Sequence, residues 1–283
     1  MEGTTSCSKT NLTISFKTND MKKLAIVGCG KLGSIVVEAI NRGLLPQYEL
    51  VGVYSRTMSK VEKMVEEFNG YGHNCRLCSD IPDLISMKPD FIVEAASPAV
   101  MHEMAIPALE RGISIVTLSI GALADDAFYD EVIQTAQRNS AHVYIVSGAT
   151  GGFDILQTAT LMGNASAKFF NEKGPNALKV TPVYEESLQE NQQIVFQGTA
   201  CEAIKMFPTK VNVTVAASRA SVGPQKMQVT MQSTPGFVSD TQRVEIKNDQ
   251  IHAVIDVYSA TAEIAGWSVV NTLRNIISPI VFC

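Results

Sequence analysis

The stretch "KKLAIVGCGKLGSIVVEAI" (22–40) places Gly28, Gly30 and Gly33 between an apolar run and a segment with helical spacing. After a buried strand, such glycines permit a tight turn, let the backbone approach a pyrophosphate, and let the next helix pack closely on the strand. The positive end of the helix dipole then faces the phosphates. This context predicts dinucleotide binding. The alternative is a tight turn of small residues that binds nothing.

Strand-like and helix-like segments alternate over the first half of the chain. Buried strands are predicted at 23–28, 48–55, 90–97, 113–119 and 142–148, with helices between them. Such alternation indicates βαβ units and a parallel sheet covered by helices on both faces. The sequence therefore predicts an α/β protein whose first domain, residues 21–147, is a doubly wound Rossmann sheet.

The pattern changes after residue 148. The alternating, strand-like runs are "KVTPVYEE", "QQIVFQGTA", "KMQVTMQST", "TQRVEIKND" and "IHAVIDVYS". Helices are expected at "TACEAIKMFP" and "NVTVAASRASV", so residues 148–255 are predicted to form a second α/β domain with a mixed or antiparallel sheet. Residues 256–283 contain a closing helix (265–280), which we expect to pack back on the first domain through Trp267, Val270 and Leu273.

Composition limits the class of protein. Of 283 residues, 46% are hydrophobic and 18% are charged, and the net charge is −5. These values are typical of a globular protein, and the negative charge argues against a nucleic-acid partner. No window approaches the roughly 18 uncharged apolar residues of a membrane span. Residues 1–20 lack the apolar core of a secretory signal, so we interpret them as a mobile leader or extension of a cytoplasmic protein.

Only two of the six cysteines, Cys75 and Cys78, lie close together in the sequence. His73 stands beside them, but a closed zinc site requires four ligands, and no second pair completes one. The sequence therefore predicts no metal. A metal or redox role for this pair is the alternative to reduced cytosolic thiols.

The end of the second predicted strand distinguishes NAD from NADP. An acidic residue at this place binds the ribose 2′-hydroxyl of NAD. This chain instead has "YSRT" (54–57), which contains no carboxylate. Ser55, Arg56 and Thr57 offer donors that suit a 2′-phosphate, and Lys31 adds positive charge nearby. NADP is therefore favoured over NAD. The alternative is that Arg56 is a solvated surface arginine.

Four further segments carry a resemblance to a known family. They are "VEAASPAV" (93–100), "TLSIGALAD" (117–125), "SGATGGFDIL" (147–156) and "FQGTACEAIKMFPTKVNVTVAA" (196–217). In this order they resemble the L-aspartate dehydrogenase family. The resemblance implies a homodimeric oxidoreductase whose second domain serves catalysis and dimerisation. It also implies interconversion of L-aspartate with oxaloacetate and ammonia through iminoaspartate, which in some relatives feeds NAD biosynthesis.

The resemblance also assigns residues to the site. The backbone of "AASPA" and the small residues of "SGATGG" would lie against the cofactor, although a glycine turn between domains is the alternative for the latter. Asn212 matches a polar residue of the family's active site, with a helix N-cap as the alternative. The expected cofactor-binding residues are Gly28, Cys29, Gly30, Lys31, Leu32, Gly33, Ser55, Arg56, Thr57, Ala95, Ala96, Ser97, Pro98, Ser119, Gly148 and Ala149.

The departures from the family pattern concern the substrate. Gln242 stands where the family carries a histidine that acts as acid and base, and glutamine cannot exchange a proton near neutral pH. Lys210 replaces an asparagine, and "SATAEIAGW" (259–267) stands in place of the family's "NPKTS". His252 is the candidate substitute for the missing histidine. The expected catalytic residues are therefore Asn212, Gln242 and His252.

The substrate itself stays open at this point. Its carboxylates need cationic partners, for which the candidates are Lys168, Lys173, Lys179, Lys205, Lys210, Arg219 and Arg243. The first hypothesis is an NADP-preferring aspartate dehydrogenase. The second is an enzyme of the same fold that acts on another amino, imino or carbonyl compound. The third is a catalytically weak NADP(H)-binding sensor or regulator.

Overall fold

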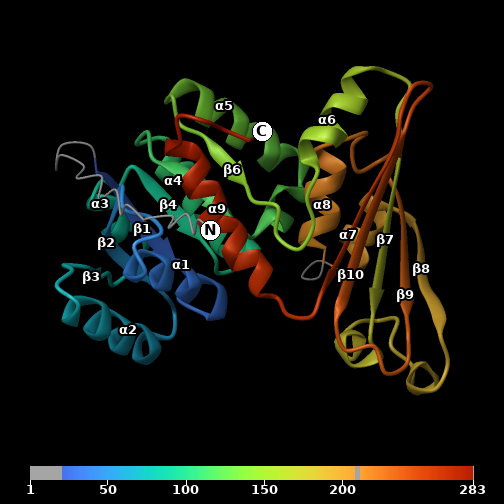
Figure 1. Cartoon of the computed structure of the whole chain (residues 1–283), viewed down its shortest axis with the longest axis horizontal. Helices are drawn as coiled ribbons and strands as arrows, with labels where there is room; N and C mark the ends of the chain where they lie inside the picture. The colour runs from blue at the N-terminus through green and yellow to red at the C-terminus, as the bar shows by residue number, and fades with distance from the viewer. Residues whose placement is uncertain (1–20, 208–210, 283) are drawn as a thin grey trace, which may run out of the picture.

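The computed structural model describes residues 21–207 and 211–282. They form two β-sheets, and Figure 1 shows these sheets in separate halves of the molecule with helices between them. The expected leader (1–20) and Lys210 lie outside the described residues. Within these ranges, no helix is both long enough and apolar enough to cross a lipid bilayer.

The first sheet is six-stranded and parallel, in the order β3-β2-β1-β4-β5-β6. Its strands are β1 (Lys22–Val27), β2 (Tyr48–Tyr54), β3 (Arg76–Leu77), β4 (Phe91–Glu94), β5 (Ser114–Thr117) and β6 (Val143–Ile145). The strand order reverses between β1 and β4. A crevice opens at the carboxyl ends of these strands, where open α/β sheets bind their ligands. The predicted Rossmann topology is confirmed.

Helices enclose this sheet because both of its faces are apolar. They are α1 (Lys31–Asn41), α2 (Met58–Gly70), α3 (Ile81–Ser86), α4 (Pro98–Leu109) and α5 (Asp126–Arg138), and a 3₁₀ helix, η2 (Ile120–Ala124), follows β5. Along β1, Leu24 and Ile26 enter one hydrophobic cluster, while Ala25 and Val27 enter another. Successive residues thus bury opposite faces of the strand, as a fully covered parallel sheet requires.

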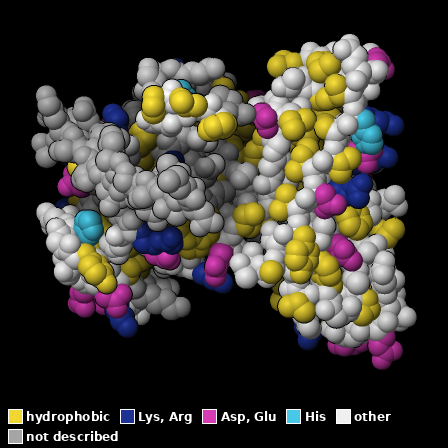
Figure 2. Space-filling model, viewed as in Figure 1, with side chains coloured by type: hydrophobic (Ala, Val, Ile, Leu, Met, Phe, Trp, Pro, Cys, Tyr) yellow, Lys and Arg dark blue, Asp and Glu magenta, His cyan; other side chains and the backbone are white. Residues whose placement is uncertain are grey.

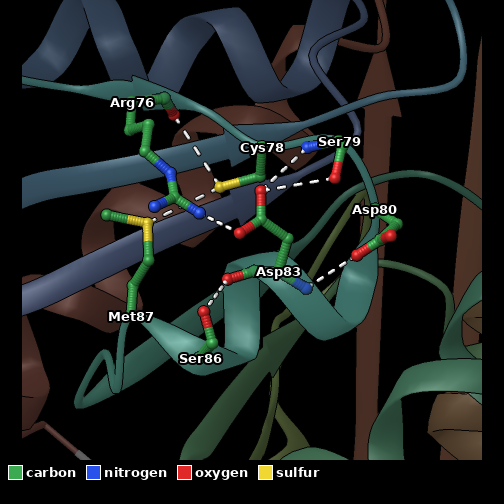
Figure 3. Close-up of polar contacts among 7 residues, drawn as sticks. All are labelled: Arg76, Cys78, Ser79, Asp80, Asp83, Ser86 and Met87. Atoms are coloured by element: carbon green, nitrogen blue, oxygen red, sulfur yellow. Dashed lines mark hydrogen bonds and ion pairs between the residues drawn. The ribbon is translucent and has the colours of Figure 1, made fainter.

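The segment between β3 and α3 shows how side chains begin a helix. Asp80 accepts a hydrogen bond from the backbone N–H of Asp83 (2.7 Å) and so caps the first turn. Asp83 accepts from the N–H of Ser79 (3.1 Å) and pairs with Arg76 (Figure 3). The hydrogen bond from Ser79, followed by the Arg76 guanidinium, holds the pKa of the Asp83 carboxyl below its usual value.

The second sheet is five-stranded and mixed, in the order β11-β10-β7-β9-β8. Its strands are β7 (Ser166–Lys173), β8 (Gln193–Thr199), β9 (Gln228–Ser233), β10 (Asp240–Lys247) and β11 (His252–Ser259). Only β7 and β9 pair in parallel within this sheet. In Figure 1, the helices α6 (Phe153–Leu161), α7 (Ala200–Met206) and α8 (Asn212–Arg219) lie on the side of this sheet that faces the first sheet.

The two faces of the second sheet differ in their surroundings. Phe169, Val229 and Val244 stand side by side on neighbouring strands and are buried on the face toward the helices, which we call the inner face. Lys168 and Arg243, each adjacent in sequence to one of these residues, are exposed on the opposite, outer face. The sheet therefore has one covered face and one face toward solvent.

The structure corrects three expectations for this half. The run "KVTPVYEE" (179–186) forms turns between the 3₁₀ helices η3 (Pro175–Leu178) and η4 (Glu186–Gln189), and its Pro182 has no N–H to donate to a sheet. The central strand β7 is absent from the sequence prediction. Finally, β11 continues to Ser259, past the domain boundary expected at residue 255.

The C-terminal helix α9 (Glu263–Ile277) returns to the first sheet. Its Val270 and Leu273 are buried in the same hydrophobic cluster as residues of β1 and α1. The hydroxyl of Tyr48 on β2 donates to the carbonyl of Leu273 (2.8 Å). A Cβ on Gly266 would stand 2.6 Å from the side chain of Ile35, so α9 crosses α1 closely at this glycine.

Candidate functional site

The glycine loop between β1 and α1 contains three glycines with different surroundings. Gly28 has a φ of +96°, and a Cβ there would stand 2.6 Å from the backbone of Ala95 and Ala96. A Cβ on Gly33 would collide with the carbonyl oxygen of Gly28. Around Gly30 there is open space, with nothing within 4 Å of a built Cβ. Packing therefore requires Gly28 and Gly33, whereas Gly30 leaves room for a ligand.

A cavity of about 200 Å³ lies at this loop, in the crevice between β1 and β4. Its lining residues are Val27, Gly28, Gly30, Tyr54, Ser55, Arg56, Thr57, Ala95, Ala96 and Val100. Helix α1 begins beside it at Lys31 without a side-chain cap, so the first N–H groups of the helix are available to an anion. The cavity at the glycine loop, the open space at Gly30 and these N–H groups fit the pyrophosphate of a dinucleotide.

The end of β2 supplies a cationic wall to this cavity. Ser55, Arg56 and Thr57 all line it, and Arg56 is exposed. A guanidinium together with hydroxyl groups can bind a phosphate through charge-assisted hydrogen bonds. The structure thus brings the three residues that the sequence singled out to the same cavity as the glycine loop.

Three side chains of the glycine loop do not line the cavity. Cys29 is buried among apolar residues, and this burial raises the pKa of its thiol to about 12. Leu32 packs partly against the same cluster. The Nζ atom of Lys31 lies 3.0 Å from a carboxylate oxygen of Glu263 at the start of α9. Lys31 therefore pairs with a carboxylate rather than adding charge to the cavity.

Glu94, at the carboxyl end of β4, is fully buried beside the crevice. Its carboxylate accepts hydrogen bonds from the backbone N–H groups of Ala96 (2.8 Å), Ser97 (3.0 Å) and Ser119 (3.2 Å). The hydroxyls of Thr117 (2.8 Å) and Ser119 (2.9 Å) bond to it as well. Burial raises the pKa of this carboxyl, and the hydrogen bonds offset part of that shift. Glu94 thereby ties the loop after β4 to the loop after β5.

The expected cofactor residues Ser97, Pro98 and Ser119 shape these loops. The hydroxyl of Ser97 accepts from the N–H of Val100 (3.3 Å) and caps α4, whose first residue is Pro98. The hydroxyl of Ser119 is bound to Glu94 (2.9 Å). Both serine side chains are thus used within the protein.

Asn212 connects the two halves of the molecule. It is the first residue of α8, and its Oδ1 accepts a hydrogen bond from the N–H of Gly121 in η2 (2.8 Å). The N-cap position of α8 is Val211, so Asn212 is not the cap of this helix. This hydrogen bond ties the start of α8 to the 3₁₀ helix that follows β5.

A second cavity, of about 250 Å³, lies where the loop after β6 meets the end of the second sheet. Its lining residues are Ala149, Lys173, Ala177, Val238, Ser239, Asp240, Ser259, Ala260, Thr261, Ala262 and Ala265. Figure 2 shows the surface hollowed between the two halves of the molecule. The N–H of Gly148 donates to Ser268 on α9 (3.1 Å), and a Cβ on Gly152 would stand 2.6 Å from Ile255 on β11. The loop 147–152 therefore contacts both α9 and the second sheet.

Polar side chains gather at this end of the inner face. We call Asn171, Lys173, Asp240 and Gln242 the inner-face polar cluster. Lys173 Nζ lies 2.9 Å from Asp240 Oδ2, and Asn171 Nδ2 donates to Asp240 Oδ1 (2.7 Å). Gln242 stands directly across from Asn171 in the β7–β10 register and is only 4% exposed. The structure therefore puts Gln242 next to an ion pair that adjoins the second cavity.

Unpartnered hydroxyls accompany the inner-face polar cluster. Ser233, Lys173, Asp240 and Ser259 form one row across four neighbouring strands. In the described ranges, the hydroxyls of Ser233, Ser259 and Thr150 are buried without a hydrogen-bond partner. Such a group costs about 1–3 kcal/mol unless it finds a partner, so this region suits a polar ligand.

His252 lies away from this cluster. Gln242 pairs with Val257 on β11, and His252 is an odd number of residues from Val257, so its side chain is on the outer face. There its Nε2 lies 3.1 Å from Glu245 Oε1, and the side chain is exposed. The structure thus separates His252 from Asn212 and Gln242, and we do not retain it as an acid or base.

Two family models match consecutive parts of the chain. "Homoserine dehydrogenase, NAD binding domain" matches residues 28–146, and "Aspartate dehydrogenase, C-terminal" matches residues 154–276. L-aspartate dehydrogenases of Methanosarcina mazei and Methanococcus maripaludis are 29% and 27% identical to this chain, over 92% of it and 98% of each relative. Over nearly its whole length, the chain is thus similar to L-aspartate dehydrogenases.

Solved structures support this fold. An aspartate dehydrogenase of Thermotoga maritima is similar with a TM-score of 0.73 and 23% identity, over 93% of this chain and 99% of that one. A hyperthermophilic archaeal homoserine dehydrogenase in complex with NADPH is similar with a TM-score of 0.61 and 15% identity, over 93% and 100% of the two chains. The predicted fold class, family and NAD(P)-dependent dehydrogenase class are confirmed.

The candidate cations of this dehydrogenase lie in different places. Lys168 and Arg243 are on the outer face, Lys179 is exposed in a turn, and Lys205 lines another cavity. Arg219 is bound to Asp126 (2.6 Å) and to the carbonyl of Leu123. Among the candidates that the structure describes, Lys173 is the one that lines the cavity beside Ala149.

The Cys75–Cys78 pair is part of the protein core. Burial raises the pKa of the Cys75 thiol to about 12, and Cys78 Sγ lies 3.5 Å from Met87 Sδ (Figure 3). His73 stacks on Phe68 at 4.0 Å between ring centroids. Within the described ranges, no three His, Cys, Asp or Glu side chains are grouped so as to hold a metal ion.

Sequence reasoning missed two features of the site in this aspartate dehydrogenase homologue. Glu94 could have been found as a carboxylate that ends an otherwise apolar strand, "FIVE" (91–94). The pair of Lys173 and Asp240 had no local signal, since these residues are far apart in the sequence and meet only through the β7–β10 register.

Proposed function

We propose that this protein is an NADP-preferring amino acid dehydrogenase that interconverts L-aspartate with oxaloacetate and ammonia. The observation that chiefly supports it is a glycine-lined cavity at the carboxyl edge of the first sheet, together with an ion-pair-lined cavity to which the loop after β6 contributes Ala149. The names of the relatives support aspartate as the substrate.

The residues of the first cavity suggest how the cofactor is held. Open space at Gly30 and the first N–H groups of α1 suit the pyrophosphate, and Arg56 suits the 2′-phosphate of NADP. When bound, the cofactor exchanges a hydride with a substrate carbon. The protein contributes orientation, because Glu94 fixes the two loops against which the cofactor would lie.

The chemistry also requires proton transfer. In the oxidative direction, L-aspartate loses a hydride from its α-carbon and a proton from its nitrogen, and water converts the resulting imine to oxaloacetate and ammonia. Gln242 can hydrogen-bond to the substrate but cannot accept that proton. A different amino, imino or carbonyl substrate is therefore the second candidate, and Gln242 is the observation that favours it. A weakly catalytic NADP(H) sensor is the third.

One assay separates these candidates. The purified protein is mixed with NADPH and ammonia, and NADPH oxidation is followed over a panel of 2-oxo acids that includes oxaloacetate. We expect turnover that depends on both the 2-oxo acid and ammonia. Turnover with another 2-oxo acid but not oxaloacetate would favour the second candidate. Tight NADPH binding without turnover of any compound would favour the sensor.

The cofactor preference has its own test. A charge-assisted bond from Arg56 to a 2′-phosphate is worth about 1.5–3 kcal/mol, which corresponds to about 10–150-fold in affinity. We therefore expect Arg56→Ala to weaken NADPH binding by that factor while leaving NADH binding unchanged. Arg111→Ala, an exposed arginine at the end of α4, is the matched control. Equal NADPH and NADH affinity in the wild type would contradict the assignment.

We propose further that the protein is a homodimer formed through the outer face of the second sheet. Ile194, Val254 and Tyr258 are 59%, 43% and 65% exposed on this sheet, and Figure 2 shows apolar side chains gathered over this half of the molecule. Sedimentation should give twice the 30.6 kDa mass of the chain. A monomer at micromolar concentration would count against the proposal, and Tyr258→Lys should weaken a dimer of this kind.

The location and pathway are also proposals. The free thiols of Cys29, Cys75, Cys78 and Cys201 support a reducing, cytoplasmic compartment. Release of an imino acid before hydrolysis would support a role in NAD biosynthesis. Trapping the product of aspartate oxidation before and after hydrolysis would test this role.

A further inference from the structure

We propose that Lys31 changes its partner when the cofactor binds: it leaves Glu263 on α9 and pairs with the pyrophosphate. Glu263 thereby lowers the affinity of this protein for its cofactor, because the lysine must break an ion pair before it can bind a phosphate. This inference rests on the proposed function and deepens it, since it names a residue outside the cavity at the glycine loop that sets cofactor affinity.

The ion pair lies where the first turns of two helices meet. Lys31 is the first residue of α1 and directly follows Gly30, which lines the cavity at the glycine loop. Glu263 is the first residue of α9, and its Oε1 lies 3.0 Å from Lys31 Nζ. A Cβ on Gly266, one turn further along α9, would stand 3.1 Å from the carbonyl oxygen of Leu32. The carboxylate is therefore held beside the end of α1 that would receive the pyrophosphate.

The electrostatics of α1 favour an anion at this position. The helix has no acidic residue in its own first turn and no side-chain cap, so the positive end of its dipole has no compensating charge from the helix itself. Glu263 supplies a negative charge from the neighbouring helix. A carboxylate in this place opposes the approach of a pyrophosphate, because the two groups carry charge of the same sign.

The ion pair contributes little to holding α9 in place. The side chains of Lys31 and Glu263 are 65% and 48% exposed, and water and salt weaken ion pairs that are this exposed. Helix α9 is held instead by the buried side chains of Val270 and Leu273, and by the hydrogen bond from Tyr48 to the carbonyl of Leu273 (2.8 Å). Loss of the carboxylate should therefore leave the fold intact and act on cofactor binding.

The Lys31 side chain can serve either partner. Its ammonium group is a compact charge on a flexible four-carbon stem, so rotation about the side-chain bonds redirects it without moving the backbone. The segment that supplies Glu263, "SATAEIAGW" (259–267), stands in place of the family's "NPKTS". The ion pair thus depends on a segment in which this chain departs from the family pattern.

The test measures cofactor affinity without turnover. NADPH and NADH are each titrated into the wild type and into Glu263→Gln, with the fluorescence of the cofactor as the signal. We expect Glu263→Gln to bind both cofactors more tightly, by about three- to tenfold at low ionic strength. The factor should be the same for both, because both contain the pyrophosphate. It should shrink toward one in about 1 M salt, which screens exposed charges.

Glu38→Gln is the matched control. Glu38 pairs with Arg42 on the same helix, also at 3.0 Å, and both side chains are 54% exposed. This substitution removes the same charge from a similar ion pair, but two turns further along α1. It should change either affinity by less than about twofold, because water and salt screen exposed charges at that separation. Thermal unfolding should show the same stability for both variants.

A double-mutant cycle tests whether Lys31 changes its partner. In the wild type, Lys31→Met removes the contact with the pyrophosphate and also the cost of breaking the ion pair, so the two effects partly cancel. In Glu263→Gln there is no ion pair to break. Lys31→Met should therefore weaken NADPH binding by a factor that is about two- to fivefold larger in Glu263→Gln than in the wild type. Additive effects would overturn the exchange of partners.

The remaining outcomes are distinguishable. Unchanged or weaker NADPH binding in Glu263→Gln would overturn this inference and leave the proposed function standing. A gain for NADPH without a gain for NADH would show that Lys31 serves the 2′-phosphate, which would overturn the role given to it here. A wild type that binds neither cofactor would refute the proposed function and this inference together.

Discussion

The two sheets offer ligands different chemical groups. At the first sheet, the cavity proposed for the cofactor is lined largely by the backbone and small side chains of loops that leave parallel strands. At the second sheet, the cavity includes the side chains of Lys173, Asp240 and Ser259, which two antiparallel pairings bring into one row. A site built from backbone depends on glycines, whose missing Cβ atoms leave room for the ligand. A site built from side chains depends on the register in which the strands pair. The two sites should therefore respond differently to substitution.

Glycine substitutions should give the largest effect and should separate two kinds of glycine. We expect Gly30→Ala to fold normally and to weaken NADPH binding by about 100-fold or more, because the new methyl group enters open space that the pyrophosphate would occupy. Gly28→Ala should lose both stability and binding, since its Cβ would stand 2.6 Å from the Ala95 backbone at a φ of +96°. Thermal unfolding and NADPH titration measure the two effects.

Gly70→Ala is the control for this comparison. Gly70 ends α2 and has nothing within 4 Å of a built Cβ, so alanine should leave both stability and cofactor affinity nearly unchanged. If Gly30→Ala binds NADPH as tightly as the wild type does, the open space at Gly30 is not where the cofactor lies.

Glu94 is the exception at the first sheet, because there a side chain organises the backbone. Glu94→Gln replaces an acceptor oxygen with an NH₂ group that faces N–H and hydroxyl donors. At least one buried donor then loses its partner, so we expect the free energy of unfolding to fall by about 1–3 kcal/mol, together with weaker NADPH binding. Urea unfolding checks this, with the exposed Glu110→Gln as control. Equal stability of the two variants would show that the carboxylate is dispensable.

The difference between the sheets also explains what the sequence can reveal. The features of the first half can be recognised from short stretches of sequence. Apolar runs, glycine spacing and the absence of an acidic residue in "YSRT" require no knowledge of contacts between distant residues. Strand β7 was missed because its inner-face positions change from Ala167 and Phe169 to Asn171 and Lys173. The polar residues that equip the cavity interrupt the apolar alternation by which a half-buried strand is recognised.

Titration of Glu94 should make the free energy of unfolding depend on pH. Burial raises the folded-state pKa of its carboxyl above the ordinary value of 4.5, so the folded protein holds this proton to higher pH than the unfolded chain does. The contribution to stability is fully present below about pH 4.5 and is lost as pH rises through the raised pKa. The stability advantage of wild type over Glu94→Gln should therefore shrink with rising pH, by at most about 1.4 kcal/mol per pH unit. A constant difference from pH 5 to pH 9 would contradict the shift.

Gln242→His should produce the smallest effect, and it tests the second sheet. Gln242 is 4% exposed, faces Asn171 across the β7–β10 register and lies two residues from Asp240. A histidine here can exchange a proton near neutral pH, which well-placed general acids and bases convert into about 10²–10⁴-fold in rate. The residues around position 242 remain those of the wild type, which surround a glutamine and not a histidine. We therefore expect a gain of only about tenfold in aspartate turnover.

The pH profile makes this last comparison decisive. A gain that follows the titration of an imidazole, near its unperturbed pKa of about 6.5, would assign the acid–base role to position 242. Gln228→His, exposed on β9, is the control and should gain nothing.

If the wild type already oxidises aspartate rapidly, the proton passes through another group, and the ion pair of Lys173 and Asp240 is the nearest candidate. If the wild type is slow and Gln242→His gains nothing, the inner face is adapted to a different substrate. The panel of 2-oxo acids then becomes the informative measurement, because it identifies which other substrate the protein accepts.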